Sequence, residues 1–121
     1  MKIKTADLTG PALDWAVAKC EGPNSEAACY YIDDLPVYLD EAPIQEWKPA
    51  TNWAQGGPII EREAIELVPD GKGSWSAAIR GGDEDDVAHG PTPLIAAMRC
   101  YVASQLGDIV EIPEELCNAP R

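Results

Sequence analysis

The fold is decided by the stretch Thr92-Pro-Leu-Ile-Ala-Ala-Met-Arg-Cys-Tyr-Val-Ala-Ser-Gln-Leu-Gly107. Thr92 can cap a helix there, Pro93 suits the first helical position, and Gly107 is typical of a helix end. We expect Arg99 to lie on the side of this helix away from the core. The core face repeats apolar side chains at helical spacing, and it holds Leu94, Met98, Tyr101, Val102 and Leu106, with Ile95 beside them.

A second helix is predicted between Thr9 and Gly22. Thr9 can act as its N-cap, Pro11 suits its first turn, and Gly22 ends it. We expect Asp14 to be an exposed residue of this helix, and a role as a general base is the alternative. The apolar face is made by four residues at helical spacing, Leu13, Ala16, Val17 and Cys20.

A β-hairpin is predicted from two extended runs, Ile65–Val68 and Ser74–Ile79, which flank the turn signal Pro69-Asp-Gly-Lys-Gly73. Upstream, Thr51 is expected to cap a short turn that the pair Gly56-Gly57 ends, after which the chain becomes extended. Other strand-like runs are Cys29–Ile32, Val37–Leu39 and Ile109–Ile112, and Pro113–Leu116 is typical of one helical turn.

These elements predict an α+β fold. Strands joined by hairpin turns, without a regular alternation of strand and helix, favour an antiparallel sheet of about four or five strands. The two main helices would pack on one face of that sheet. A chain of 121 residues has the size of one domain, so residues 1–121 are expected to form a single domain.

The charge is strongly acidic, with nine basic and 21 acidic residues and a formal net charge of −12. Direct binding to a nucleic-acid backbone or an anionic membrane needs clustered Lys and Arg, so both are disfavoured as partners. Fifteen of the acids lie in three stretches without Lys or Arg, at 21–47, 81–98 and 100–120. The simplest role for this charge is solubility, and an interaction face is the alternative.

The chain begins without an apolar leader and contains no apolar run long enough to span a membrane, so we expect a cytoplasmic protein. Its four cysteines form no C-x-x-C pair and are expected to be reduced and largely buried. Phosphate-binding, dinucleotide-binding and hydrolase motifs are absent, and a single His with scattered carboxylates disfavours a metal centre. No cofactor is expected.

Two glycine-containing segments, 52–63 and 89–93, hold most of the amide, imidazole and guanidinium groups suited to a ligand. Paired glycines allow close backbone approach, Trp53 offers a stacking face, and a helix N-terminus favours an anion. One interpretation is ordinary structure: a turn, a core Trp and a helix cap. The other is a shared polar cleft, whose residues would be Asn52, Trp53, Gln55, Gly56, Gly57, Arg62, His89, Gly90, Thr92 and Arg99.

Three long strings resemble the NinX-like family of small tailed-phage proteins. The resemblance implies a phage or prophage accessory protein made in a bacterial cytoplasm, and it assigns no catalytic residue. It is weakest over 25–50 and at the acidic loop 82–86. The strings are Thr9-Gly-Pro-Ala-Leu-Asp-Trp-Ala-Val-Ala-Lys-Cys-Glu-Gly22, Thr51-Asn-Trp-Ala-Gln-Gly-Gly-Pro-Ile-Ile-Glu-Arg-Glu63 and His89-Gly-Pro-Thr-Pro-Leu-Ile-Ala-Ala-Met-Arg-Cys-Tyr-Val-Ala-Ser104, and the ending Glu111-Ile-Pro-Glu-Glu-Leu116 also matches.

Three functions compete at this point. The first is a non-enzymatic protein that captures a small anionic or nucleotide-like ligand, which would suit a phage product that counters host defence. The second is an acidic interaction module, such as a DNA mimic that occupies a host protein. The third is a small enzyme that uses His89 as its acid–base group. Apolar surfaces on both helices also allow a homodimer.

Overall fold

The computed structural model describes residues 1–22, 25, 31–32, 35–36, 47–79 and 87–117. They confirm the α+β class, with antiparallel strand pairing throughout. In chain order the elements are β1 (Lys2–Lys4), the 3-10 helix η1 (Thr5–Asp7), α1 (Gly10–Glu21), β2 (Tyr31–Ile32), β3 (Leu35–Pro36), α2 (Trp53–Glu63), β4 (Ile65–Pro69), β5 (Trp75–Ile79), β6 (Ala88–Gly90), α3 (Pro93–Leu106), β7 (Ile109–Glu111) and α4 (Glu114–Cys117).

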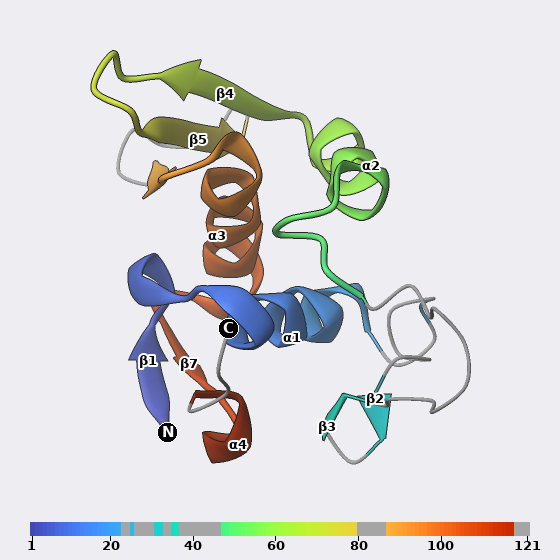
Figure 1. Ribbon diagram of the computed structural model, residues 1–121. Helices are drawn as coiled ribbons and strands as arrows, with labels where there is room; N and C mark the ends of the chain where they lie inside the picture. The colour runs from blue at the N-terminus through green and yellow to red at the C-terminus, as the bar shows by residue number, and fades with distance from the viewer. Residues whose placement is uncertain (23–24, 26–30, 33–34, 37–46, 80–86, 118–121) are drawn as a thin grey trace.

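Helix α3 is the centre of the molecule (Figure 1). The strands β4, β5 and β6 lie against one part of it, α1 crosses it at the other end, and α2 contacts it from the side. The fully buried core side chains come mainly from α1, α2 and α3, and include Leu13, Val17, Ile59, Met98 and Val102. Both predicted main helices therefore supply the core.

The strands do not join into one sheet, which corrects the expected single sheet of four or five strands. They form three separate ladders among the described residues, with orders β1-β7, β2-β3 and β4-β5-β6. The ladder β1-β7 ties the two ends of the described chain together, because Ile3 pairs with Val110. In Figure 1, the helix α1 lies between the pair β1-β7 and the strands β4 and β5.

The predicted hairpin is confirmed as β4 and β5, with Leu67 opposite Ala77. The strand β6 was missed, and it pairs antiparallel with β5 so that Ser76 lies opposite His89. The strand β1 was also missed, whereas β7 and the short helix α4 lie where the sequence predicts them. The β-branched pair Ile109-Val110 indicates β7, whereas the sequences of β1 and β6 contain few residues that favour a strand.

Helix α3 has the predicted ends. The Thr92 hydroxyl accepts a hydrogen bond from the Ile95 amide at 3.1 Å, and Gly107 follows the last turn. Two expectations about its faces were wrong: Leu106 is 40% exposed, and Arg99 is only 9% exposed. A helix with neighbours on several sides buries more than one stripe, so periodicity alone misplaced Arg99.

Helix α2 corrects the prediction of a short turn followed by extended chain. The cap is Asn52 and not Thr51, since the Asn52 Oδ1 accepts the Ala54 amide at 2.9 Å. The helix then continues through Gly56, Gly57 and Pro58, although Pro58 lacks the N–H of one intrahelical bond. Tertiary packing outweighs the weak helix propensity of these three residues.

Asp14 also lies elsewhere than expected. It is 3% exposed, and its Oδ1 accepts the Ala50 amide at 3.0 Å. This bond fixes the segment before α2 against α1, so the carboxylate has a structural role in the described contacts.

Of the other predicted features, Cys29, Val37–Leu39 and the acidic loop 81–86 lie outside the described residues. In the described part of the chain, no helix has the length and apolar character needed to cross a membrane.

Candidate functional site

The site residues predicted from the sequence fall into two groups in the structure. Residues 52–62 lie in and before α2, whereas residues 89–99 lie in β6 and α3. In the α2 group, the Gln55 Oε1 accepts the Lys48 amide at 2.6 Å. Gly56 packs so closely on the Pro49 carbonyl and the Leu94 side chain that a Cβ atom would not fit. The described contacts of these residues position α2.

Two members of the α2 group lack such roles among the described contacts. Trp53, in the first turn of α2, is 55% exposed, so it is not a core residue. A Cβ atom at Gly57 would meet no atom within 4 Å. Neither residue lines the groove described below.

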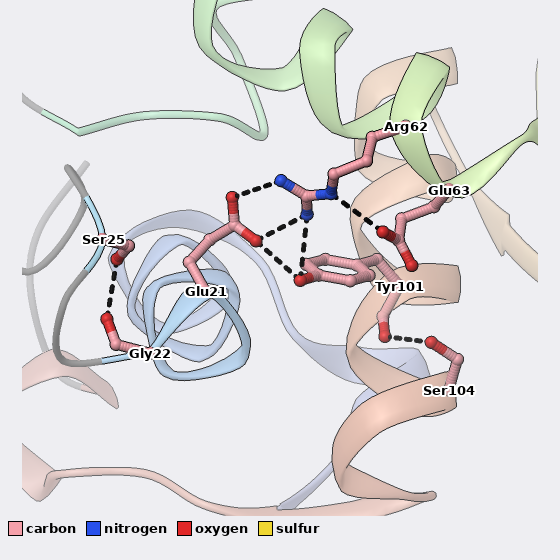
Figure 2. A network of polar contacts seen from close by, with 7 residues as sticks. All are labelled: Glu21, Gly22, Ser25, Arg62, Glu63, Tyr101 and Ser104. Atoms are coloured by element: carbon pink, nitrogen blue, oxygen red, sulfur yellow. Dashed lines mark hydrogen bonds and ion pairs between the residues drawn. The ribbon is translucent and has the colours of Figure 1, made fainter.

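Arg62 is the charged residue of the α2 group, and carboxylates hold its side chain in place (Figure 2). Its Nη1 and Nη2 donate to the two carboxylate oxygens of Glu21 at 3.1 and 2.6 Å, and its Nε donates to Glu63 at 2.9 Å. Nη2 also donates to the Tyr101 hydroxyl, which in turn donates to Glu21 at 2.6 Å. These residues, the Arg62 network, connect the last turns of α1 and α2 to the middle of α3.

The network shifts the pKa values of its members. Burial opposes ionisation of Glu21, but hydrogen bonds from Arg62 and Tyr101 outweigh it and hold the pKa of this carboxyl below its usual range. Burial and the bond to Glu21 raise the pKa of Tyr101 above its ordinary value. The bonds to Glu21 and Glu63 likewise raise the pKa of Arg62. All three groups are therefore fixed in their ordinary charge states at neutral pH.

The second group surrounds the junction of β6 and α3. The His89 Nδ1 is hydrogen-bonded to the Ser76 hydroxyl at 3.2 Å, across the pair of strands β5 and β6. Gly90 packs against the first turn of α3, where an added Cβ would collide with the Ala96 amide nitrogen. The lack of a side chain at Gly90 therefore lets β6 and α3 approach closely.

Arg99 differs from Arg62 in its partners. Its Nε donates to the Leu8 carbonyl at 2.8 Å and its Nη1 donates to the His89 carbonyl at 2.9 Å. Nη2 makes no hydrogen bond within the described residues, and no carboxylate there forms an ion pair with Arg99. Burial lowers the pKa of Arg99, and the more distant charge of Asp7 opposes this. The guanidinium remains a cation at neutral pH, because arginine loses its proton only under strongly basic conditions.

Arg99 lines a groove of about 960 Å³. We call it the Arg99 groove. It lies between β6, the beginning of η1 and one side of α3, and its volume is in the range of small-molecule sites. Its described lining residues are Lys4, Thr5, Ala6, Gly73, Ser74, Ile79, Val87, Ala88, His89, Gly90, Pro91, Arg99, Cys100, Ala103, Ser104, Asp108 and Ile109.

The described lining of the Arg99 groove holds more basic than acidic groups, whereas the whole chain is acidic. Among its described lining residues, Lys4, His89 and Arg99 carry basic groups and Asp108 carries the one carboxylate. Two hydroxyl groups of the lining are already used as donors, since Thr5 donates to the Gly107 carbonyl and Ser104 donates to the Tyr101 carbonyl. Basic groups therefore outnumber carboxylates among the described lining residues of the groove.

The groove unites three of the predicted site residues, His89, Gly90 and Arg99, and Thr92 caps the helix that follows. The prediction from the sequence missed three other lining residues, Lys4, Ala103 and Ser104. Helical spacing places Ala103 one turn beyond Arg99 and Ser104 one turn beyond Cys100, and this could have indicated that Ala103 shares the side of Arg99. Lys4 carries no such signal, because it reaches the groove through the pairing of β1 with β7.

The described residues contain no cluster of three or more His, Cys, Asp or Glu side chains that could hold a metal ion. Burial and the Glu21 carboxylate raise the pKa of the Cys20 thiol to about 12, so it is not a thiolate at neutral pH.

A search of curated proteins finds no match to this chain. A family model described as Bacteriophage P22, NinX matches residues 4–105. The match includes α1, α2, all but the last residue of α3 and most of the groove lining. The chain therefore belongs to this NinX family of phage proteins.

Proposed function

We propose that this phage protein is a non-enzymatic accessory protein that binds a small anionic ligand in the Arg99 groove. Nucleotide-like molecules are among the ligands that this proposal includes. In the cytoplasm of a bacterial host, such binding would remove a signal or metabolite from solution without any chemical step. Counteraction of host defence is one use for a protein of this kind.

One observation carries the proposal. Arg99 is a buried cation that lines the groove, and its only described hydrogen-bond partners are two neutral carbonyl oxygens. Burial of a charge without an opposite charge is costly, so the position favours binding of an anion. The carbonyls hold the guanidinium in place, which reduces the entropy lost when a ligand binds.

The other proposed functions have less support among the described contacts. An acidic interaction module would depend mainly on the acids at 21–47 and 81–98, and most of these lie outside the described residues. An enzyme using His89 would need a reacting group beside the imidazole. The Ser76 hydroxyl bonded to it is not part of the described groove lining. We therefore assign the function to the Arg99 groove.

A thermal-shift screen of nucleotides, inorganic phosphate and small carboxylates tests the proposal. A ligand at 100 times its dissociation constant stabilises the folded state by about 2.7 kcal/mol, which is readily measured as a higher Tm. Lys4→Gln should reduce this shift, because Lys4 lines the groove. Lys2→Gln, two residues away on the same strand and outside the groove lining, is the matched control. Absence of any shift at high ligand excess would remove the proposal.

A further inference from the structure

The available atoms of Arg99 restrict which anion can bind in the groove. An arginine binds a carboxylate best through a fork of two N–H groups, which comprises either Nε and Nη2 or Nη1 and Nη2. In this protein the Leu8 carbonyl accepts from the single N–H of Nε, and the His89 carbonyl accepts from one of the two N–H groups of Nη1. The fork of Nε and Nη2 is therefore incomplete, whereas the second N–H of Nη1 and both N–H groups of Nη2 make no hydrogen bond within the described residues.

The other donors in the groove come from different elements. Lys4 lies at the end of β1, His89 lies in β6, and Arg99 extends from α3. Within the described part of the chain, Lys4 forms no ion pair, and Asp108 is the single acidic residue in the lining. Three basic groups on three elements can each meet a different oxygen of a tetrahedral anion. A planar carboxylate offers only two oxygens in one plane.

The groove also has an apolar wall. Ile79, Val87, Ala103 and Ile109 line it, and Val87 and Ile109 are 37% and 59% exposed. Apolar side chains at an open groove favour a ligand with an apolar or aromatic part, because its binding removes that surface from water. Free inorganic phosphate would leave this wall uncovered.

We propose that the ligand of the Arg99 groove is an organic phosphate monoester, whose phosphoryl oxygens meet Arg99 Nη2, Lys4 and His89 and whose aromatic or apolar part covers the wall. This inference rests on the proposed function and specifies the chemical class of its ligand. A monoester carries between one and two negative charges at neutral pH, which matches the excess of basic groups better than a carboxylate does.

A titration of the full chain followed by ¹H–¹⁵N NMR tests the inference with three matched probes: phenyl phosphate, benzoate and inorganic phosphate. Phenyl phosphate and benzoate share the ring and differ in the anion, whereas phenyl phosphate and inorganic phosphate differ in the ring. We expect phenyl phosphate to bind about tenfold more tightly than either of the other two. The amides of Gly90, Ser104 and Ile109 report binding in the groove.

Variants and two further ligands complete the test. Lys4→Gln should weaken phenyl phosphate binding about threefold, while Lys2→Gln leaves it unchanged. Adenosine monophosphate should bind more tightly than glucose 6-phosphate, because its base can cover the apolar wall.

The possible failures are distinguishable. If benzoate binds as tightly as phenyl phosphate, the groove is an anion site and the phosphate assignment is wrong. If inorganic phosphate binds as tightly as phenyl phosphate, the role of the apolar wall is wrong. If none of the probes shifts the groove amides, both the inference and the proposed function are wrong.

Discussion

Arg62 and Arg99 have opposite environments. Arg62 has a half-exposed side chain whose nitrogens contact the carboxylates of Glu21 and Glu63 and the Tyr101 hydroxyl. Arg99 is buried, and its described partners are two backbone carbonyls. Both residues join separate parts of the chain, but Arg62 pairs with carboxylates whereas Arg99 has no carboxylate partner among the described residues.

The difference shows why a cluster of polar residues is a weak guide to function. Charge on Arg62 is neutralised within the protein, so its contribution is to hold α1, α2 and α3 together. Charge on Arg99 is held in place without being neutralised, which is the condition for binding an anion from solution. The following predictions test this distinction, in order of decreasing effect.

The largest effect on stability is expected from Arg99→Met. The substitution removes the donors of two carbonyls, and hydrogen bonds from charged groups contribute about 1.5–3 kcal/mol each. Removal of the buried charge offsets part of this cost, so the net loss should be about 3 kcal/mol. Arg62→Met should cost about 1 kcal/mol, because pairs of exposed charges contribute little. Urea unfolding of both variants measures the difference. Equal losses would contradict the assignment of Arg99 to a buried position.

The position of α2 is tested by two adjacent glycines. Gly56→Ala should cost about 2–3 kcal/mol, since the new methyl group would collide with the Pro49 carbonyl. Gly57→Ala is the control, because its methyl group meets open space and alanine is the better helix former, which should stabilise the protein by up to about 1 kcal/mol. The Tm values of the two variants, each compared with that of the wild type, measure these opposite effects. A lower Tm for Gly57→Ala would show that α2 is not helical at this point.

A smaller effect is expected from Tyr101→Phe. The variant loses the hydroxyl that accepts from Arg62 and donates to Glu21, while the ring stays in place. The expected cost is about 1 kcal/mol. In the background of Glu21→Gln the cost should be smaller, because the carboxylate partner is already gone. A double-mutant cycle by chemical unfolding measures this coupling, and additive losses would exclude it.

The smallest effect concerns pH. The pKa of Glu21 is lower in the folded protein, so its contribution to stability is complete above the ordinary glutamate pKa of about 4.3 and is lost as the pH falls through the lowered value. The free energy of unfolding should therefore differ between the wild type and Glu21→Gln by a few tenths of a kcal/mol to about 1 kcal/mol at pH 7. The gap should close at acidic pH. A gap that is constant from pH 7 to pH 3 would mean that Glu21 does not interact with Arg62.

Much of the fold could be predicted from local signals. Thr92, Pro93 and Gly107 define the ends of α3, and the turn signal between Pro69 and Gly73 defines the hairpin, because caps and turns depend on neighbouring residues. Helix α2 could not be predicted, since Gly56 and Pro58 disfavour a helix locally. Its stability comes from contacts with Pro49 and from the Arg62 network.

The candidate site was only partly predictable for a related reason. His89, Gly90 and Arg99 are close enough in sequence for one segment to indicate them. The burial of Arg99 depends on the segments that contain Leu8 and His89 covering its side of α3. The presence of Lys4 depends on a pairing between strands more than 100 residues apart. Contacts between residues so far apart in the sequence cannot be predicted from the spacing of residues within one short segment.

The most direct test of the central claim is an NMR titration that follows the arginine Nε–H signals of the full chain as phenyl phosphate is added. The signals of Arg62 and Arg99 are assigned with Arg62→Lys and Arg99→Lys. If the groove holds the anion, the Arg99 signal shifts in a saturable manner and the Arg62 signal stays in place. A shift of Arg62 with no change at Arg99 would contradict the account.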